Sequence, residues 1–358
     1  MAEASHAVNG AWQEWEDVMA ERWRNRPEGS TWGDWGADDQ RGRMNLVTPE
    51  CRRAAAQEVQ DGLCFCLSMP LNFPGGNAVN PKRHPPRFGE VIHPPTGRLY
   101  YNYDWALDQA DNMDITSDEC VTIYSQYSTQ WDSFAHVGSR FDADGDGEAE
   151  AVYYNGYRAH EHVLGPDAEG GMGARALGVE NMAAGGMQGR GVLVDLVPHV
   201  GIARTAIGYD QLMGILDADG VEVEEGDFFL FHTGWDDMIM EMAGQPDAEK
   251  LHASGAVLNG FDDKLLNWIT DSGLVALISD NMAIEDSHGY GETQGGCSRL
   301  PIHRHCLFRL GVHLGEIWYL SELAAALKER GRSRFMLTAP PLRLPGAVGS
   351  PATPIATI

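Results

Sequence analysis

The sequence predicts an α/β (mixed α+β) fold in a single domain, with a mixed central β-sheet or a barrel-like β core flanked by helices. Three observations lead to this expectation: short apolar runs typical of buried strands, helix-like segments between them, and no strict alternation of strand and helix. The 358 residues are 43% hydrophobic, which is enough for one large core. No internal repeat and no clean linker divides the chain.

The N-terminal part is expected to be helical. Tryptophans between Trp12 and Trp23 recur at near-helical spacing and predict an amphipathic helix that ends near Arg24. We therefore expect residues 1–30 to form a helical extension and residues 31–358 to form the main domain.

The other elements follow from apolar runs and capping signals. Thr48 as N-cap and Pro49 at the first helical position predict a helix through Val59. Ser321 is expected to cap a helix that ends at Gly331. Two further helices are expected at 209–216 and 263–270, and strands at 63–69, 120–124, 191–195, 227–232, 274–278 and 335–337. The proline-rich stretch 72–95 is expected to be irregular, and long loops of this kind are often lids or subunit contacts.

Charge and cysteine content exclude several classes of protein. The chain has 26 basic and 52 acidic residues, a net charge of −26, which disfavours partners such as nucleic acid and anionic membranes. We find no signal peptide and no apolar run long enough to span a membrane. The six cysteines include no C-x-x-C pair and are interpreted as free thiols of a cytoplasmic protein.

A first group of metal-capable side chains lies between Gln126 and His136. If the segment is extended, Gln126, Gln130 and Asp132 share one face. Carboxylate and amide oxygens with an imidazole are ligands of hard or borderline divalent ions, and His136 is a further ligand or a proton shuttle. The alternative is a polar strand edge with a surface histidine.

A second group lies near the C-terminus and includes His303, His305, His313 and Glu316. With Asp132, the carboxylate of Glu316 would balance the charge of a divalent ion. The alternative is an ordinary helix with solvated histidines.

Three other patterns carry less weight. Asp142-x-Asp144-x-Asp146 resembles the start of a calcium loop, but its twelfth position is Tyr153, so an acidic turn is favoured. The glycine-rich stretches lack dinucleotide and P-loop patterns. No Gly-x-Ser-x-Gly elbow is present, which argues against a serine hydrolase.

The two groups, together with several segments between and around them, carry a resemblance to a known family. The segments are Trp32-Gly-Asp-Trp35, Gly226 to Trp235, Ser279-Asp280-Asn281 and Ala339 to Gly346. The chain resembles the cyclase-type metal-dependent hydrolases, which include bacterial kynurenine formamidase and isatin hydrolase. It is most similar to a larger subgroup with the pattern Gln-x-x-x-Gln-Trp-Asp-x-x-x-His, to which trans-dienelactone hydrolase belongs.

The resemblance implies a swivelling β/β/α fold, a metal site and a homodimer or homotetramer. Its implied ligands are Gln126 and Gln130 in place of two histidines, Asp132, His303 and Glu316. His136 stands at the position of the acid/base. Amides in place of imidazoles tilt the expected ion from zinc toward manganese.

We therefore expect a metal-dependent hydrolase, with Mn or Zn, that acts on a small cyclic ester or amide or on an aryl formamide. His136 and Glu316 are the expected catalytic residues, and Trp35, Trp131 and Trp235 the expected walls of the substrate pocket. Two alternatives stay open: a metal-dependent lyase or dehydratase on the same scaffold, and a non-catalytic binding protein with a degenerate site.

Overall fold

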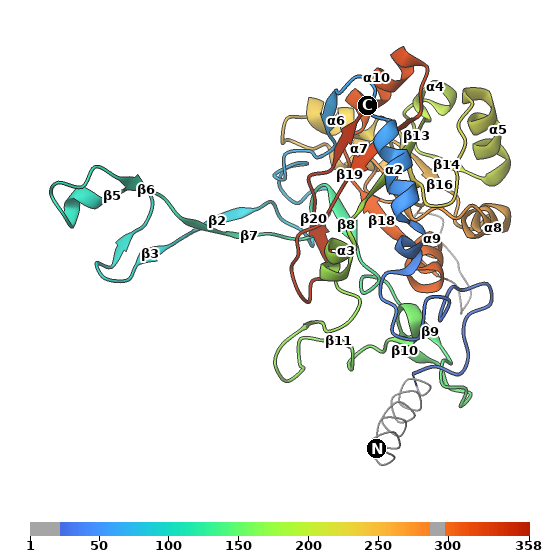
Figure 1. Ribbon diagram of the computed structural model, residues 1–358, viewed down its shortest axis with the longest axis horizontal. Helices are drawn as coiled ribbons and strands as arrows, with labels where there is room; N and C mark the ends of the chain where they lie inside the picture. Colours follow the sequence, from blue (N-terminus) through green and yellow to red (C-terminus); the bar gives the residue numbers. More distant parts are fainter. Residues whose placement is uncertain (1–21, 287–297) are drawn as a thin grey trace, which may run out of the picture.

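A nine-stranded mixed sheet forms the centre of the molecule (Figure 1). The structure, a computed structural model, describes residues 22–286 and 298–358. Across the sheet the strands are β1 (Cys64–Cys66), β21 (Ile355–Thr357), β19 (Arg334–Thr338), β13 (Gln188–Asp195), β15 (Phe228–His232), β17 (Ala276–Ser279), β18 (His313–Glu316), β8 (Gln130–Asp132) and β20 (Gly349–Pro351). The four strands from β13 to β18 are parallel, and the flanking strands pair antiparallel. The predicted mixed sheet is confirmed.

Both faces of the sheet are buried, as the continuous apolar runs of its central strands predict. Along β15, Phe229 and Phe231 enter one hydrophobic cluster, and Phe228 and Leu230 enter another. Each buried phenylalanine contributes roughly 1.5–3 kcal/mol.

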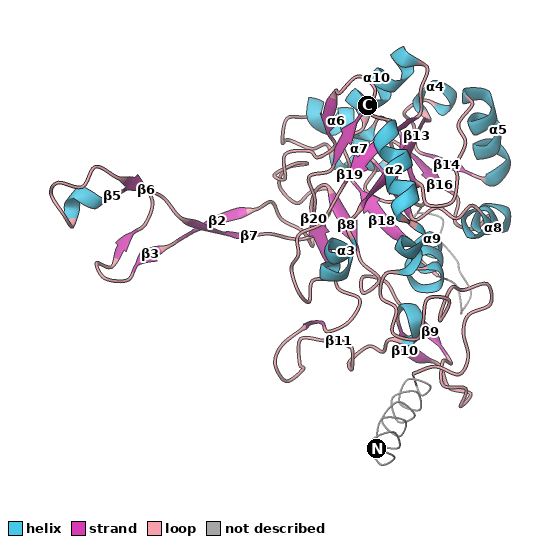
Figure 2. Cartoon of the chain, viewed as in Figure 1, coloured by secondary structure: helices cyan, strands magenta, loops and turns pink. Residues whose placement is uncertain are grey.

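Helices cover the two faces (Figure 2). They are α2 (Pro49–Gln57), α3 (Val179–Gly185), α4 (Val197–Val200), α5 (Tyr209–Asp219), α6 (Trp235–Glu241), α7 (Ala248–His252), α8 (Asp263–Asp271), α9 (Pro301–His303) and α10 (Ser321–Arg330). A π-helix over Arg304–Leu310 continues α9, and short 3-10 turns lie at Gly42–Leu46, Trp105–Leu107 and Tyr154–Gly156. The apolar residues of α5 and α8 join the first cluster, and those of α3 and α10 the second. Among the described residues, no helix is long and apolar enough to cross a membrane.

Strands outside the main sheet form two-stranded ribbons. They are β2 (Arg87–Glu90) with β7 (Glu119–Thr122), β3 (Ile92–His93) with β4 (Arg98–Leu99), β5 (Tyr103–Asp104) with β6 (Ile115–Thr116), β9 (Ser139–Phe141) with β10 (Glu150–Val152), β11 (Val163–Leu164) with β12 (Gly173–Ala174), and β14 (Thr205–Ile207) with β16 (Ala256–Leu258). The first three ribbons build a long projection, residues 87–122, which we call the arm (Figure 1).

Most predicted elements of the body are confirmed, with different ends. The strands expected at 191–195, 227–232, 274–278 and 335–337 are β13, β15, β17 and β19, and the helices expected at 209–216 and 263–270 are α5 and α8. α2 begins at Pro49, with the Thr48 hydroxyl accepting from Cys51 N–H, as predicted. The five described cysteines are free.

Four expectations need correction or fall outside the structure. The helix expected from Trp12 lies almost wholly outside the described residues, and residues 22–24 are not helical. The strand expected at 63–69 shortens to β1. The stretch 72–95, expected to be irregular, contains β2 and β3, because this part of the chain pairs within the arm. Ser321 is the first residue of α10 rather than its cap, since its hydroxyl is bonded to Asp236.

Candidate metal centre

Strand β8 places two polar side chains on one buried face of the sheet. Gln130 and Asp132 are both fully buried, and their alternation along β8 directs them to the same side. In the pairing of β8 with β18, Gln130 is the register partner of Glu316. Two segments 186 residues apart in the chain therefore meet at one point.

Of the two carboxylates on this face, Glu316 also accepts from the Ile284 N–H over 3.3 Å, whereas the hydrogen-bond donor to Asp132 in the described chain is Gln130. Nε2 of Gln130 donates to Oε2 of Glu316 over 3.1 Å and to Oδ1 of Asp132 over 3.4 Å. The other amide atom, Oε1 of Gln130, is buried and has no hydrogen-bond partner in the part of the chain that the structure describes. Burial raises the pKa of Asp132, and the nearby charge of His136 opposes that rise. A buried carboxylate with so few donors, beside an orphaned amide oxygen, fits the donor set of a bound cation.

His303, at the end of α9, faces both carboxylates. Its Nε2 is 3.3 Å from Glu316 Oε1 and 3.9 Å from Asp132 Oδ2. Its Nδ1 is 2.6 Å from Oε1 of Glu285. Burial alone would lower the pKa of His303, but its hydrogen bonds to Glu285 and Glu316 raise the pKa well above its ordinary value. An imidazole whose second nitrogen is held by a carboxylate is typical of metal-binding histidines.

Glu285 is a part of this centre that the sequence analysis did not single out. Its side chain is wholly buried and also accepts from the backbone N–H groups of Ile302 and His303. It therefore fixes both the start of α9 and the orientation of the His303 ring. The available signal was an acidic residue in the loop shortly after Ser279-Asp280-Asn281, beyond the carboxyl end of β17.

His136 is the most accessible member of the group. Its Nε2 is 3.9 Å from Asp132 Oδ1, and 23% of its side chain is exposed, whereas Asp132 is fully enclosed. A turn after β8, in which His136 N–H donates to the Ser133 carbonyl, returns the ring toward the carboxylate. Ligand atoms of Asp132, His136 and His303 all lie within 4.8 Å of one another.

Gln126 reaches this region from a turn rather than from a strand. The extended face predicted for residues 126–132 is wrong, since the strand covers only the last three of them. A Cβ built on Gly349 would lie 2.2 Å from Nε2 of Gln126, so the amide occupies the space beside this glycine. Gly349 is the register partner of Asp132, which puts the Gln126 amide on the same face as the carboxylate.

The three tryptophans expected to wall the pocket lie in different environments. Trp131 points to the opposite face of β8 from Asp132, is fully buried, and donates its indole N–H to the Ala339 carbonyl. It is a core residue in this structure, away from the carboxylates. Trp235 lines a small cavity together with Gln126. Trp35 is half-buried and makes no ring contact or side-chain hydrogen bond among the described residues.

Two histidines of the predicted C-terminal group are not part of the centre. His305 accepts from or donates to the Thr270 hydroxyl over 2.9 Å, and burial lowers its pKa to about 4. His313 stacks on Phe134 with ring centroids 4.0 Å apart, and burial lowers its pKa to about 3. Both stay neutral in the core.

Asp142, Asp144 and Asp146 lie in the turn between β9 and β10. Oδ1 of Asp142 accepts from the N–H of Gly145 over 2.7 Å, and Asp144 pairs with Arg158. These contacts are those of the acidic turn favoured from the sequence.

A second cluster of acids and a histidine lies at the carboxyl ends of β13, β15 and β17. His232, Asp236 and Asp280 bring ligand atoms within 4.8 Å of one another. Asp280 accepts from the N–H groups of Thr233 and Trp235, both over 2.9 Å. Asp236 accepts from the N–H groups of Leu320 and Ser321 and from the Ser321 hydroxyl, over 2.6–2.8 Å. The carboxylates of Asp280 and Asp236 therefore already accept hydrogen bonds from backbone N–H groups.

Part of this cluster has the layout of a serine hydrolase triad. Nδ1 of His232 is 2.8 Å from Asp195 Oδ1, and Nε2 is 3.1 Å from Ser321 Oγ. The Ser321 hydroxyl, however, donates to Asp236. Burial opposes protonation of His232, but its bonds to Asp195 and Asp236 raise its pKa to about 11. A protonated imidazole cannot take a proton from serine, so the array is a structural ion cluster that ties α6 and α10 to the sheet.

Comparison with known proteins shows to which family the chain belongs. The Cyclase family model matches residues 65–286. A crystal structure described as a novel cyclase has 31% sequence identity, covers 92% of this chain and 97% of its own, and has a TM-score of 0.71. The chain belongs to the cyclase family.

More distant structures of the family share the fold. Isatin hydrolase A from Labrenzia aggregata, bound to benzyl benzoate, has 14% identity, covers 84% of this chain and 94% of its own, and has a TM-score of 0.52. A search of curated proteins finds no match. Family membership confirms the resemblance at that level, and the finer likeness to trans-dienelactone hydrolase stays a prediction.

Proposed function

We propose that this cyclase-family protein is a metal-dependent hydrolase of a small carbonyl compound: a lactone, lactam or imide, or an aryl formamide. The observation that carries the proposal is the convergence of Asp132, His136 and His303, with ligand atoms within 4.8 Å, beside the orphaned Oε1 of Gln130. Among the described residues no backbone N–H donates to the Asp132 carboxylate, in contrast to the acids of the His232 cluster.

The proposed ligands are Asp132, Glu316 and His303, with Gln130 and Gln126 supplying amide oxygens. A divalent ion, Mn or Zn, would polarise the substrate carbonyl and lower the pKa of a water. The oxygen-rich donor set favours manganese over zinc. Glu285 holds the His303 ring in position through Nδ1.

His136 is proposed to move the proton of the reaction. It is the partly exposed member of the group and lies 3.9 Å from Asp132, within reach of a substrate that approaches from solvent. It would take a proton from the attacking water and return it to the leaving oxygen or nitrogen. Trp235, which lines the small cavity beside Gln126, is proposed as a wall of the substrate pocket.

The test combines metal analysis with a substrate panel. Protein purified without chelators should carry near-stoichiometric Mn or Zn, and Asp132→Ala should lose it. Lactones including a dienelactone, cyclic amides and aryl formamides are then screened in ¹⁸O-labelled water with added Mn or Zn. Hydrolysis places one solvent oxygen in the carboxylate product, whereas a lyase or dehydratase product without that label would overturn the proposal.

The role of His136 has its own test. His136→Ala should keep the metal and lose roughly 10²–10⁴-fold in turnover, the usual contribution of a general acid or base. Full turnover in this variant would remove His136 from the mechanism.

A further inference from the structure

A small cavity adjoins the candidate metal centre, between the turn that carries Gln126 and the end of β18. Gln126 lines it on one side, and Ile317, the residue directly after Glu316, lines it on another. Trp235 contributes an apolar wall. One proposed metal ligand therefore lines the cavity and a second directly precedes a residue that does, so a group held there can belong to the same small molecule as a carbonyl at the centre.

Ile317 is held in a backbone conformation that β-branched residues rarely adopt. Its φ angle is 58°, in the left-handed region, and its side chain is buried. Its N–H donates to the Asn281 carbonyl over 3.0 Å, and its carbonyl accepts from the Thr129 hydroxyl over 2.6 Å. Strain of this kind persists where surrounding contacts enforce it, and such positions concentrate at ligand-binding sites. The wall of the cavity beside Glu316 is therefore fixed by the fold.

Arg83 also lines the cavity and brings a positive charge to it. The residue is half-buried, and in residues 22–286 and 298–358 its Nη1 donates to the Gln126 carbonyl over 2.5 Å, while no carboxylate pairs with its guanidinium. A guanidinium carries five N–H donors, so others are available to a ligand. Burial raises the pKa of Asp132, and the charge of Arg83 is one of those that oppose this rise, which puts the guanidinium near the centre.

The sequence around Arg83 differs in charge from the rest of this acidic chain. Acidic residues occupy 52 of the 358 positions, yet none lies between Asp61 and Glu90. The basic residues in that interval are Lys82, Arg83 and Arg87. A positive segment in a chain of net charge −26 attracts anions locally, and it offers Arg83 no acid of its own.

We propose that Arg83 is a specificity-determining residue that binds a carboxylate of the substrate in this cavity. With Nη1 bonded to the Gln126 carbonyl, the edge formed by Nε and Nη2 is left for the carboxylate, which a planar guanidinium holds through two parallel N–H···O bonds. The cavity is small, which suits a carboxylate rather than a second ring. The substrate class narrows accordingly to lactones, cyclic amides or aryl formamides that carry an acid group. This narrowing rests on the proposed function, whereas carboxylate binding by Arg83 does not.

The first experiment measures binding rather than hydrolysis. Benzoate and benzamide differ in charge but hardly in shape, and calorimetry of the protein purified without chelators compares their dissociation constants. Benzoate should bind about 10–100-fold more tightly, the usual contribution of a charge-assisted pair. Arg83→Gln should abolish this preference, and Arg83→Lys, which keeps the charge but not the planar fork, should retain part of it.

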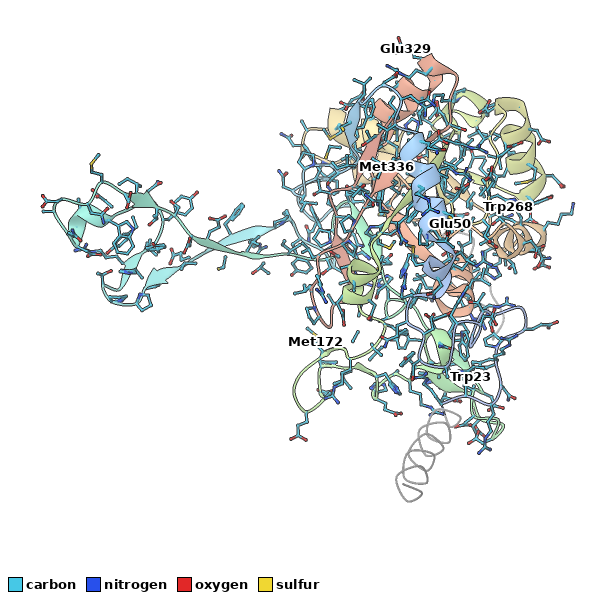
Figure 3. The ribbon with its side chains drawn as sticks, viewed as in Figure 1. Trp23, Glu50, Met172, Trp268, Glu329 and Met336 are labelled. Carbon is cyan, nitrogen blue, oxygen red and sulfur yellow. The ribbon has the colours of Figure 1, made fainter. Side chains whose placement is uncertain are left out.

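Arg87→Gln is the matched control for the binding measurement. It removes the same charge from an exposed arginine at the start of β2, in the arm, whose side chains stand clear of the body (Figure 3). Its preference for benzoate should equal that of the wild type. Equal binding of benzoate and benzamide to the wild type would overturn the proposal. A preference that survives in Arg83→Gln would do the same, since the carboxylate would then be held elsewhere. Inorganic phosphate that binds more tightly than benzoate and depends on Arg83 would overturn the choice of carboxylate.

The second experiment asks whether the cavity selects substrates. The lactone paraconate and the aryl formamide para-formamidobenzoate are each compared with the corresponding carboxamide. Arg83→Gln should lower the ratio of kcat/KM for acid over carboxamide about 10–100-fold, chiefly through KM. A purely structural role of Arg83 through Gln126 would affect both members of each pair alike, and an unchanged ratio would contradict the proposal. If neither member of a pair is hydrolysed while benzoate binding depends on Arg83, the proposed function fails and the carboxylate site stands.

Discussion

The molecule contains two buried clusters of carboxylates and a histidine, and they differ in how fully their polar atoms are hydrogen-bonded. In the cluster around His232, Asp236 accepts three hydrogen bonds from Leu320 and Ser321 at 2.6–2.8 Å. In the cluster around His303, no donor in residues 22–286 and 298–358 lies closer than 3.4 Å to the Asp132 carboxylate. Both sets contain ligand atoms within 4.8 Å of one another. Residue type and proximity therefore do not separate a structural ion cluster from a candidate metal centre.

The two clusters differ in the groups that donate hydrogen bonds to their carboxylates. Backbone N–H groups at the starts of α6 and α10 donate hydrogen bonds to the acids of the His232 cluster. In the other cluster Glu316 accepts from the Ile284 N–H, but the donors to Asp132 in the described chain are side chains, and Oε1 of Gln130 has no partner there. Buried polar groups are almost always satisfied, so an unsatisfied set is the better candidate for a ligand. Stability and function should consequently respond in opposite ways when the two sites are changed.

The largest expected effect comes from a matched pair of substitutions. Asp236→Asn breaks a buried ion pair with His232 and removes the charged acceptor of the Leu320 and Ser321 N–H groups, and should cost roughly 3–5 kcal/mol of unfolding free energy. Asp132→Asn removes a buried charge with few partners, so the metal-free protein should keep its stability within about 1 kcal/mol or gain from the change. Urea unfolding of both variants in the presence of a chelator measures this.

Metal content provides the reverse comparison. Asp132→Asn should lose bound Mn or Zn, and folded Asp236→Asn should retain it, as measured by mass spectrometry of the metal. If Asp132→Asn unfolds as readily as Asp236→Asn and keeps its metal, the two clusters have been assigned the wrong way round.

Glu285 links the candidate centre to the fold and should give a smaller effect. Glu285→Gln keeps the shape of the side chain but removes the charge that supports the His303 ring. Partners of this kind usually change metal affinity by about 10–100-fold when replaced. Competition with a chromogenic chelator measures the affinity, and Glu322→Gln, on the exposed side of α10, is the control. Equal affinity in the two variants would leave Glu285 a purely structural role.

The parts of the fold that were predicted correctly have a local cause. β15, β17 and the second half of β13 contain continuous apolar runs, and α5 and α8 have apolar faces that match the helical period. The periodicity of hydrophobic residues reflects which side chains are buried, so it predicts the elements that pack on the core. Of the arm, only the strand expected at 120–124 was predicted, and it is β7; the other strands were missed because they face solvent on both sides, with Arg87–Glu90 exposed throughout. A ribbon held only by its own pairing leaves no such pattern.

Within the candidate centre, the sequence located residue types but not their partners. Asp132, His303 and Glu316 were found because their types and the family resemblance pointed to them. Glu285 was not found, since a carboxylate that orients a histidine through Nδ1 is recognisable only once the fold brings them within 2.6 Å. Trp131 was expected in the pocket because it neighbours Asp132 in sequence, but the alternation along β8 turns it to the opposite face, where its indole N–H donates to the Ala339 carbonyl.

The last comparison uses pH to ask whether the His232 array is structural. The pKa of His232 is raised to about 11 from an ordinary value of 6.5, so its contribution to stability is complete below pH 6.5 and is lost as the pH rises toward 11. Over pH 8–10 the folded protein holds a proton that the unfolded chain has released, and stability should fall by up to about 1.4 kcal/mol per pH unit from this group. His232→Gln lacks the group, so the stability gap between wild type and variant should narrow over this range. Asp280, whose pKa burial raises to about 7, has finished titrating by then. A gap that stays constant would mean that His232 is neutral, and therefore free to accept the Ser321 proton, which would reopen a serine mechanism for this protein.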